Sequence, residues 1–190
     1  MNFKQLIHAL AFCLLTFSGL ADSSQQHSVD ALTGAQTWSN DGHGVQLSLT
    51  QILPDQLKAF YGNRGFTLEQ IEAYTSTCVY MTVLRNDNAD GTIHFIRDNW
   101  SVIAGGQQHA LVPVDEWVKR LTTVDTPKAA LVAFRWAQFP VEQSYQPGGD
   151  WNQGMLSVAL SPGTPFDLIA HWDIEGKPFQ LSLKQVHCAK

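Results

Sequence analysis

Alternation of apolar and polar side chains predicts half-buried strands along much of this chain. In residues 45–50 (VQLSLT) and again in residues 179–184 (FQLSLK), every second side chain is apolar. A period of two places one set of side chains toward a core and the other toward water. Runs rich in β-branched and aromatic residues predict further strands. These runs are 78–85, 92–97, 100–103, 129–139, 154–160 and 166–172.

Two of these runs carry more specific expectations. The polar stretch NDNADG between 78–85 and 92–97 has the composition of a turn, so the two strands are expected to pair as a hairpin. Residues 129–139 begin apolar on both faces, which is typical of a central strand in a packed sheet. Trp136 shares the apolar face of that strand and is expected in the core, as is Trp172.

Helical signals interrupt the strands early in the chain. Pro54 suits the first turn of a helix, and Thr67 with Gln70 forms a capping-box pair that starts a second one. Apolar residues at helical spacing follow each start, and the helical pair is expected to end at Ser76. A further short helix is expected over residues 113–121, where the apolar side chains fall on one side.

Seven or eight short strands separated by turn signals predict a mainly β domain. The expected architecture is an antiparallel immunoglobulin-like sandwich, with the helical hairpin at about residues 54–76 inserted between early strands. No internal repeat with a period of about 20–50 residues is present in the sequence.

The N-terminus has the order of a secretory signal peptide, predicted over residues 1–21. Lys4 precedes the apolar run 6–17, and small residues follow before the first acid. That run is short for a bilayer span, and no later run is longer, so no membrane span is expected after signal removal. Residues 22–40 are predicted to be a flexible leader and residues 41–190 a single domain. The protein is therefore expected to be exported, to the periplasm or to the medium.

The charge balance narrows the choice of partners. Removal of Lys4 with the signal reduces the 12 Lys and Arg residues to 11, against 17 Asp and Glu residues, a net charge of −6. No basic block exists in the sequence, so nucleic-acid binding and polybasic membrane contact are not expected.

Two cysteines remain after signal removal, Cys78 and Cys188. An even count in an oxidising compartment predicts a disulfide between them. Closing a loop of about 110 residues contributes roughly 4–5 kcal/mol on the chain-entropy model. Because His187 is adjacent to Cys188, a metal ligand or a reactive thiol is the alternative.

The predicted loop at residues 140–153 is the preferred binding site. Residues 147–149 (PGG) are a strong turn signal, and connections of this length are more often functional than short ones. Tyr145, Asp150 and Trp151 are the candidate ligand contacts, because exposed aromatic rings stack on sugars or peptides. The expected function is non-catalytic binding of an unknown small ligand or an extracytoplasmic protein.

A periplasmic metal-binding protein is the alternative function. Imidazole and thioether groups on strands suit copper or zinc, although no H-x-x-x-H or C-x-x-C spacing occurs. No other cofactor is expected. The candidate ligands are His94, His171, His187 and Met155.

A hydrolase is the third hypothesis. The chain lacks the G-x-S-x-G motif of a nucleophile elbow. Glu142 and Asp150 flank the predicted loop, but acids at turns commonly cap backbone amides. No catalytic residue is assigned.

Overall fold

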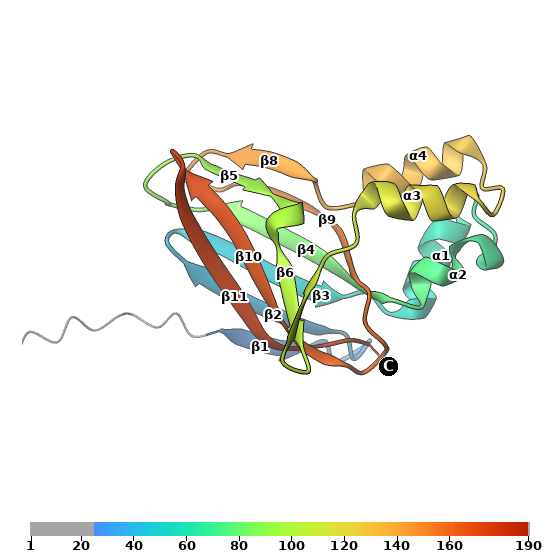
Figure 1. Cartoon of the computed structure of the whole chain (residues 1–190). Helices are drawn as coiled ribbons and strands as arrows, with labels where there is room; N and C mark the ends of the chain where they lie inside the picture. Colours follow the sequence, from blue (N-terminus) through green and yellow to red (C-terminus); the bar gives the residue numbers. More distant parts are fainter. Residues whose placement is uncertain (1–24, 190) are drawn as a thin grey trace, which may run out of the picture.

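The computed structural model describes residues 25–189, so the predicted signal peptide lies outside the described residues. These residues form two antiparallel sheets that face each other and four helices gathered at one end of them (Figure 1). The first sheet has five strands in the order β1-β2-β3-β4-β9. Its strands are β1 (Gln26–Val29), β2 (Gln36–Gly42), β3 (Val45–Gln51), β4 (Cys78–Asn86) and β9 (Asp150–Val158).

The second sheet is built around β10. On one edge β10 pairs with β11, and on the other it pairs first with β6 and then with β5. A 3-10 turn, η1 (Arg97–Asn99), interrupts the path from β5 to β6. The outer partners are β7 on β6 and β8 on β5. The bounds are β5 (Ile93–Ile96), β6 (Ser101–Ala104), β7 (Gln107–Ala110), β8 (Glu142–Tyr145), β10 (Pro165–Ile174) and β11 (Lys177–His187).

The main core lies between the two sheets and explains the alternation in the sequence. In β3, Val45, Leu47 and Leu49 are fully buried, whereas the residues between them are partly exposed. Leu181 and Leu183 of β11 pack into the same cluster from the second sheet. The strands predicted from alternation are thus confirmed, but the strand orders do not confirm an immunoglobulin topology.

The predicted disulfide is confirmed. Cys78 begins β4 in the first sheet, and Cys188 follows β11 in the second, with Cα atoms 5.1 Å apart across a sequence separation of 110 residues. Both cysteines are buried in the main core. The bridge therefore ties the end of the last strand to the opposite sheet.

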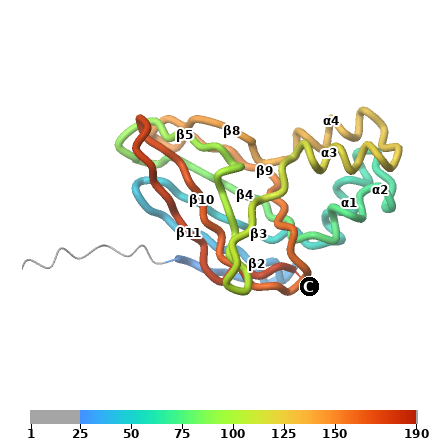
Figure 2. Tube along the Cα trace, in the orientation of Figure 1, coloured from blue at the N-terminus to red at the C-terminus, as the bar shows by residue number. Residues whose placement is uncertain are grey.

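The helices come from two separate stretches of chain. The first pair, α1 (Pro54–Gly62) and α2 (Leu68–Thr75), connects β3 to β4, as predicted, and Thr67 and Gln70 form the expected capping box. The second pair, α3 (Val114–Thr122) and α4 (Lys128–Ala137), connects β7 to β8. The two pairs lie side by side (Figures 1 and 2).

A second core holds the helices on the outer face of the first sheet. Tyr61, Tyr74 and Phe134 are fully buried, and their ring centroids lie 4.9–5.6 Å apart. Met155 of β9 packs into this cluster from the sheet. The indole N–H of Trp117 donates to Ser157 Oγ at 2.7 Å, which fixes α3 to the same strand.

The prediction of a central strand at residues 129–139 is wrong, because this segment is helix α4. Its apolar residues occupy both parities of a strand, so they fit a helix equally well, and its alanines favour one. Ala130 and Phe134, spaced by four, are the side chains that the helix buries. Trp136 falls on the opposite side and is 86 % exposed, so its predicted core position is also wrong, whereas Trp172 is buried as expected.

A further prediction about strands is wrong. β5 does not pair with β4 as a hairpin; it belongs to the other sheet, because the intervening turn crosses between sheets. Asn86 organises that crossing by donating to Gly91 O and accepting from Ala89 N, each at 3.0 Å. In the predicted leader, residues 22–40, β1 and most of β2 form an antiparallel pair. β1 is exposed throughout, so it has no apolar face for alternation to reveal.

Candidate functional site

The predicted loop at residues 140–153 is largely regular structure. It contains β8, a short turn at 146–149 and the start of β9. Gly148 and Gly149 have positive φ, and their N–H groups donate to Asp87 O and Asn86 O at 3.0 and 2.8 Å. The Pro-Gly-Gly sequence therefore serves the turn, as its chemistry predicts.

The three predicted ligand contacts have different surroundings. Tyr145 is 2 % exposed and packs against Phe95, with ring centroids 5.7 Å apart. Burial, followed by the nearby charge of Asp150, raises the pKa of its phenol. Asp150 is exposed, and its Oδ2 accepts from Gln146 N at 3.1 Å. Trp151 is half exposed on β9. The structure thus leaves Asp150 and Trp151 accessible and buries Tyr145.

Trp136, with 86 % of its surface exposed, is the most exposed aromatic side chain within residues 25–189. It lies on α4 one turn after Val132, which is 47 % exposed, and the two share one face of the helix. Two hollows border it, one toward β9 and one toward α1.

The hollow toward β9, hereafter the crevice, has a volume of about 420 Å³. It lies where the chain leaves α4 and passes the edge of the first sheet. Phe139 N donates to Met155 O at 2.9 Å there, and the chain then continues into β8 of the second sheet. The crevice is lined by Arg135, Trp136, Gln138, Pro140, Asn152 and Gln153.

Several polar groups of the crevice are already engaged. Gln138 is buried, and its amide contacts the hydroxyls of Tyr61 and Tyr74 at 3.0 and 3.1 Å. Arg135 Nη1 pairs with Asp115 Oδ1 at 2.7 Å. The crevice therefore offers a polar ligand few polar side chains that lack a partner and are held in one position.

The hollow toward α1, hereafter the α1–α4 groove, has a volume of about 430 Å³. Its lining is mostly apolar. Arg64 lies at its edge with its guanidinium 3.4 Å from the centroid of the Phe60 ring, and it donates to Phe60 O at 2.9 Å. The groove is lined by Phe60, Arg64, Ala129, Val132, Ala133, Trp136 and Ala137.

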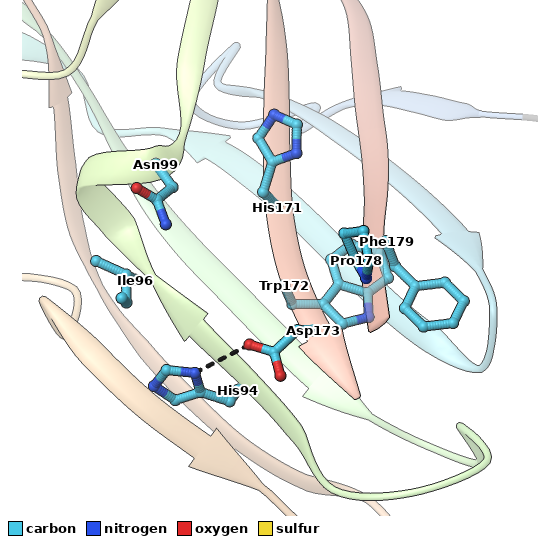
Figure 3. A pocket seen from close by; sticks show the side chains of 8 residues that line it. All are labelled: His94, Ile96, Asn99, His171, Trp172, Asp173, Pro178 and Phe179. Atoms are coloured by element: carbon cyan, nitrogen blue, oxygen red, sulfur yellow. Dashed lines mark hydrogen bonds and ion pairs between the residues drawn. The ribbon is translucent and has the colours of Figure 1, made fainter. Parts of the chain in front are cut away.

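A separate polar cluster lies on the outer face of the second sheet. His94 of β5 contacts Asp173 of β10 through Nδ1 at 3.1 Å and Glu142 of β8 through Nε2 at 2.8 Å. Figure 3 shows the His94–Asp173 contact and, two residues before Asp173 in β10, the ring of His171. His94, His171 and Asp173 border a depression of about 380 Å³, to which Asn99 also contributes.

The carboxylates around His94 favour its protonated form. Its pKa is raised, mainly by the hydrogen bond to Glu142 and then by the one to Asp173. The pKa of Asp173 is lowered, first by the N–H of Gly176 and then by His94. When protonated, the imidazole donates from both nitrogens and links three neighbouring strands.

The four predicted metal ligands are not brought together. His94 and His171 border one depression, but the carboxylates beside His94 engage opposite nitrogens of its ring. Met155 lies in the helical core, where its sulfur accepts from the Tyr61 hydroxyl at 3.2 Å, and His187 is the last residue of β11. Within residues 25–189, no group of three or more His, Cys, Asp or Glu side chains is arranged to hold one metal ion.

The residue that sequence reasoning missed is Trp136. The helical spacing of residues 128–137 indicates that its side chain is exposed. The positions 128, 132 and 136 fall on one row of a helix and 129, 133 and 137 on the next, away from the buried Ala130 and Phe134.

Comparison with known proteins gives no relative from which a function is transferred: no family model, no curated protein and no solved structure matches this chain. Across residues 25–189, no helix combines the length and the apolar character needed to cross a membrane.

Proposed function

We propose that this chain is an exported, non-catalytic binding protein whose recognition surface consists of Trp136 with the crevice and the α1–α4 groove beside it. The observation that carries the proposal is the exposure of Trp136. This side chain is 86 % exposed, whereas Trp38, Trp100, Trp117 and Trp172 are each at most 3 % exposed. The chain therefore buries most of its indoles and presents this one on helix α4.

Burying this side chain against a partner contributes a large favourable free energy of binding. Aromatic side chains bury about 150–250 Å² in cores and interfaces. Covering about 150–200 Å² of Trp136 contributes roughly 4–5 kcal/mol before the costs of association are subtracted. Tryptophan and arginine are also the residues most enriched at the energetic centres of interfaces, and Arg64 and Arg135 flank Trp136 here.

Only part of the predicted loop at residues 140–153 belongs to this surface. Pro140, Asn152 and Gln153 line the crevice, whereas Trp151, the residue before Asn152, lines neither hollow. Tyr145 has no part in the proposed surface because it is buried. The centre of the proposed site thus moves from the turn to helix α4.

Export is part of the proposal. The Cys78–Cys188 disulfide supports it, because such bonds persist in oxidising compartments. The signal-like order of the first 21 residues supports it from the sequence.

Site-specific photo-crosslinking in the source cells tests the function. A photoreactive phenylalanine analogue replaces Trp136 in one variant and Leu68, which is 64 % exposed at the start of α2 and lines neither hollow, in the control. We expect a discrete adduct from position 136 alone, and excess wild-type protein should suppress it whereas excess Trp136→Ser protein should not. The absence of an adduct, or an equal one from position 68, contradicts the proposal.

A further inference from the structure

We propose that the α1–α4 groove binds an amphipathic helix of a partner protein in which acidic side chains flank the apolar stripe. This inference rests on the proposed function above and specifies the chemistry of the partner. It is carried by the shape of the groove, its apolar lining and the charges at its rim.

The shape fits a helix laid along α4. Ala129, Ala133 and Ala137 follow one another at intervals of four residues and form the floor. Small side chains in such a row let a second helix approach closely, and the larger Phe60 and Trp136 line the same groove. Helix-in-groove recognition places apolar anchors at i, i+3 or i+4, and i+7 in a channel of this kind.

The lining fits the apolar stripe of such a helix. Val132 and Trp136 are 47 % and 86 % exposed, so both lose solvent contact when the groove is filled. Contiguous exposed apolar surface of this kind marks interaction sites on soluble proteins. Arg64 is the sole charged side chain of the lining, and its guanidinium lies over the Phe60 ring.

The rim carries positive charge on a chain whose net charge is −5. Arg64 lines the groove, and Lys128 lies on the same helical row of α4 as Val132, whereas Arg135 lines the neighbouring crevice. Arg135 is paired with Asp115, but within residues 25–189 neither Arg64 nor Lys128 forms an ion pair. Acidic side chains on the partner complement these charges and steer its approach.

The same charges disfavour two other occupants. A second copy of the chain brings its own basic rim against this one, and like charges across an interface are unfavourable. A membrane surface is attracted by about 1 kcal/mol per basic residue, and two unpaired cations with one tryptophan fall short of the two signals that stable attachment requires.

A peptide selection tests the inference. A displayed library of random 16-residue peptides is selected on the oxidised wild-type protein and counter-selected on Ala133→Arg, which fills the floor of the groove. We expect enriched sequences with apolar residues at i, i+3 or i+4, and i+7 and with a negative net charge. We expect them to bind at least tenfold more weakly to Val132→Ser and Trp136→Ser, and equally well to Leu68→Ser and Trp151→Ser.

Several results overturn the inference. The selection yields no enriched peptides, or it enriches basic or non-periodic peptides, or Trp151→Ser weakens peptide binding as much as Trp136→Ser does; each of these outcomes contradicts the inference. If the protein co-sediments with vesicles of phosphatidylcholine and phosphatidylglycerol and Trp136→Ser abolishes this, the surface binds membranes instead. If light scattering shows a dimer that Ala133→Arg dissociates, the surface binds a second copy of the chain instead. If peptides fail while the crosslink at position 136 persists, the proposed function stands and this inference fails.

Discussion

Gln138 is predicted to control how firmly α4 is attached to the rest of the molecule. It follows the helix, is 8 % exposed, and joins two buried phenols. Tyr74 donates to Gln138 Oε1 at 3.1 Å, and Gln138 Nε2 donates to Tyr61 Oη at 3.0 Å and to Phe134 O at 3.2 Å. Tyr61 in turn donates to Met155 Sδ at 3.2 Å. Gln138→Leu keeps the approximate shape and removes every one of the amide contacts.

The magnitude follows from which groups lose their partners. Tyr74 loses its acceptor, and an orphaned buried hydroxyl costs about 1–3 kcal/mol. Tyr61 keeps the methionine sulfur as an acceptor, so its loss is smaller, about 0.5–1 kcal/mol. Leucine recovers about 1 kcal/mol through its apolar side chain. We therefore expect Gln138→Leu to lower the free energy of unfolding by roughly 0.5–3 kcal/mol.

A double-mutant cycle isolates the cause. Tyr74→Phe removes the orphaned hydroxyl, so the double variant Gln138→Leu/Tyr74→Phe is expected to be more stable than Gln138→Leu alone. Urea denaturation of the oxidised proteins, followed by tryptophan fluorescence and circular dichroism, measures the four free energies. Additive losses, with the double variant the least stable of the four, refute the reasoning.

Two further predictions concern the polar cluster and the disulfide. The folded pKa of His94 lies above the ordinary 6.5 and that of Asp173 below 3.8, so their ion pair contributes fully between these values. It weakens as the pH rises through the folded pKa of His94 or falls through that of Asp173. Both side chains are about one-third exposed, so His94→Gln should lower the free energy of unfolding by about 0.5–1 kcal/mol near pH 5 and by less near pH 8. Urea denaturation at the two pH values measures this, and an equal loss at both contradicts the prediction. Replacing Cys78 and Cys188 with alanine should lower the free energy of unfolding by about 4–5 kcal/mol, matching the reduced wild-type protein, and a loss below about 1 kcal/mol contradicts the entropic account.

The sequence predicted those elements whose two faces meet different surroundings. β3 and β11 each turn one face to the main core, so their alternation was informative. α2 was predictable because its capping box is a local signal. β1 left no trace, since it is exposed on both faces and is held by backbone pairing with β2. The partner of β5 was also beyond local pattern, because a polar turn does not reveal whether the chain stays in one sheet or crosses to another.

The proposed site was predictable only in part. The turn at 147–149 and the accessibility of Asp150 and Trp151 agree with the sequence reasoning. Tyr145 faces inward because β8 turns that side of the strand toward Phe95, which depends on the distant strand β5. Trp136 was misplaced because an alanine-rich apolar segment satisfies both periods, and only the second core under α4 distinguishes them.

Fluorine NMR of the 5-fluorotryptophan-labelled protein tests the central claim most directly, since all six tryptophans report at once. Trp136→Phe and Trp151→Phe assign the two exposed resonances. On titration with extracytoplasmic extract of the source cells, we predict that the Trp136 resonance shifts or broadens while the four buried tryptophans stay unchanged. An unmoved Trp136 resonance across the titration, or a change confined to Trp151, contradicts a recognition surface centred on Trp136.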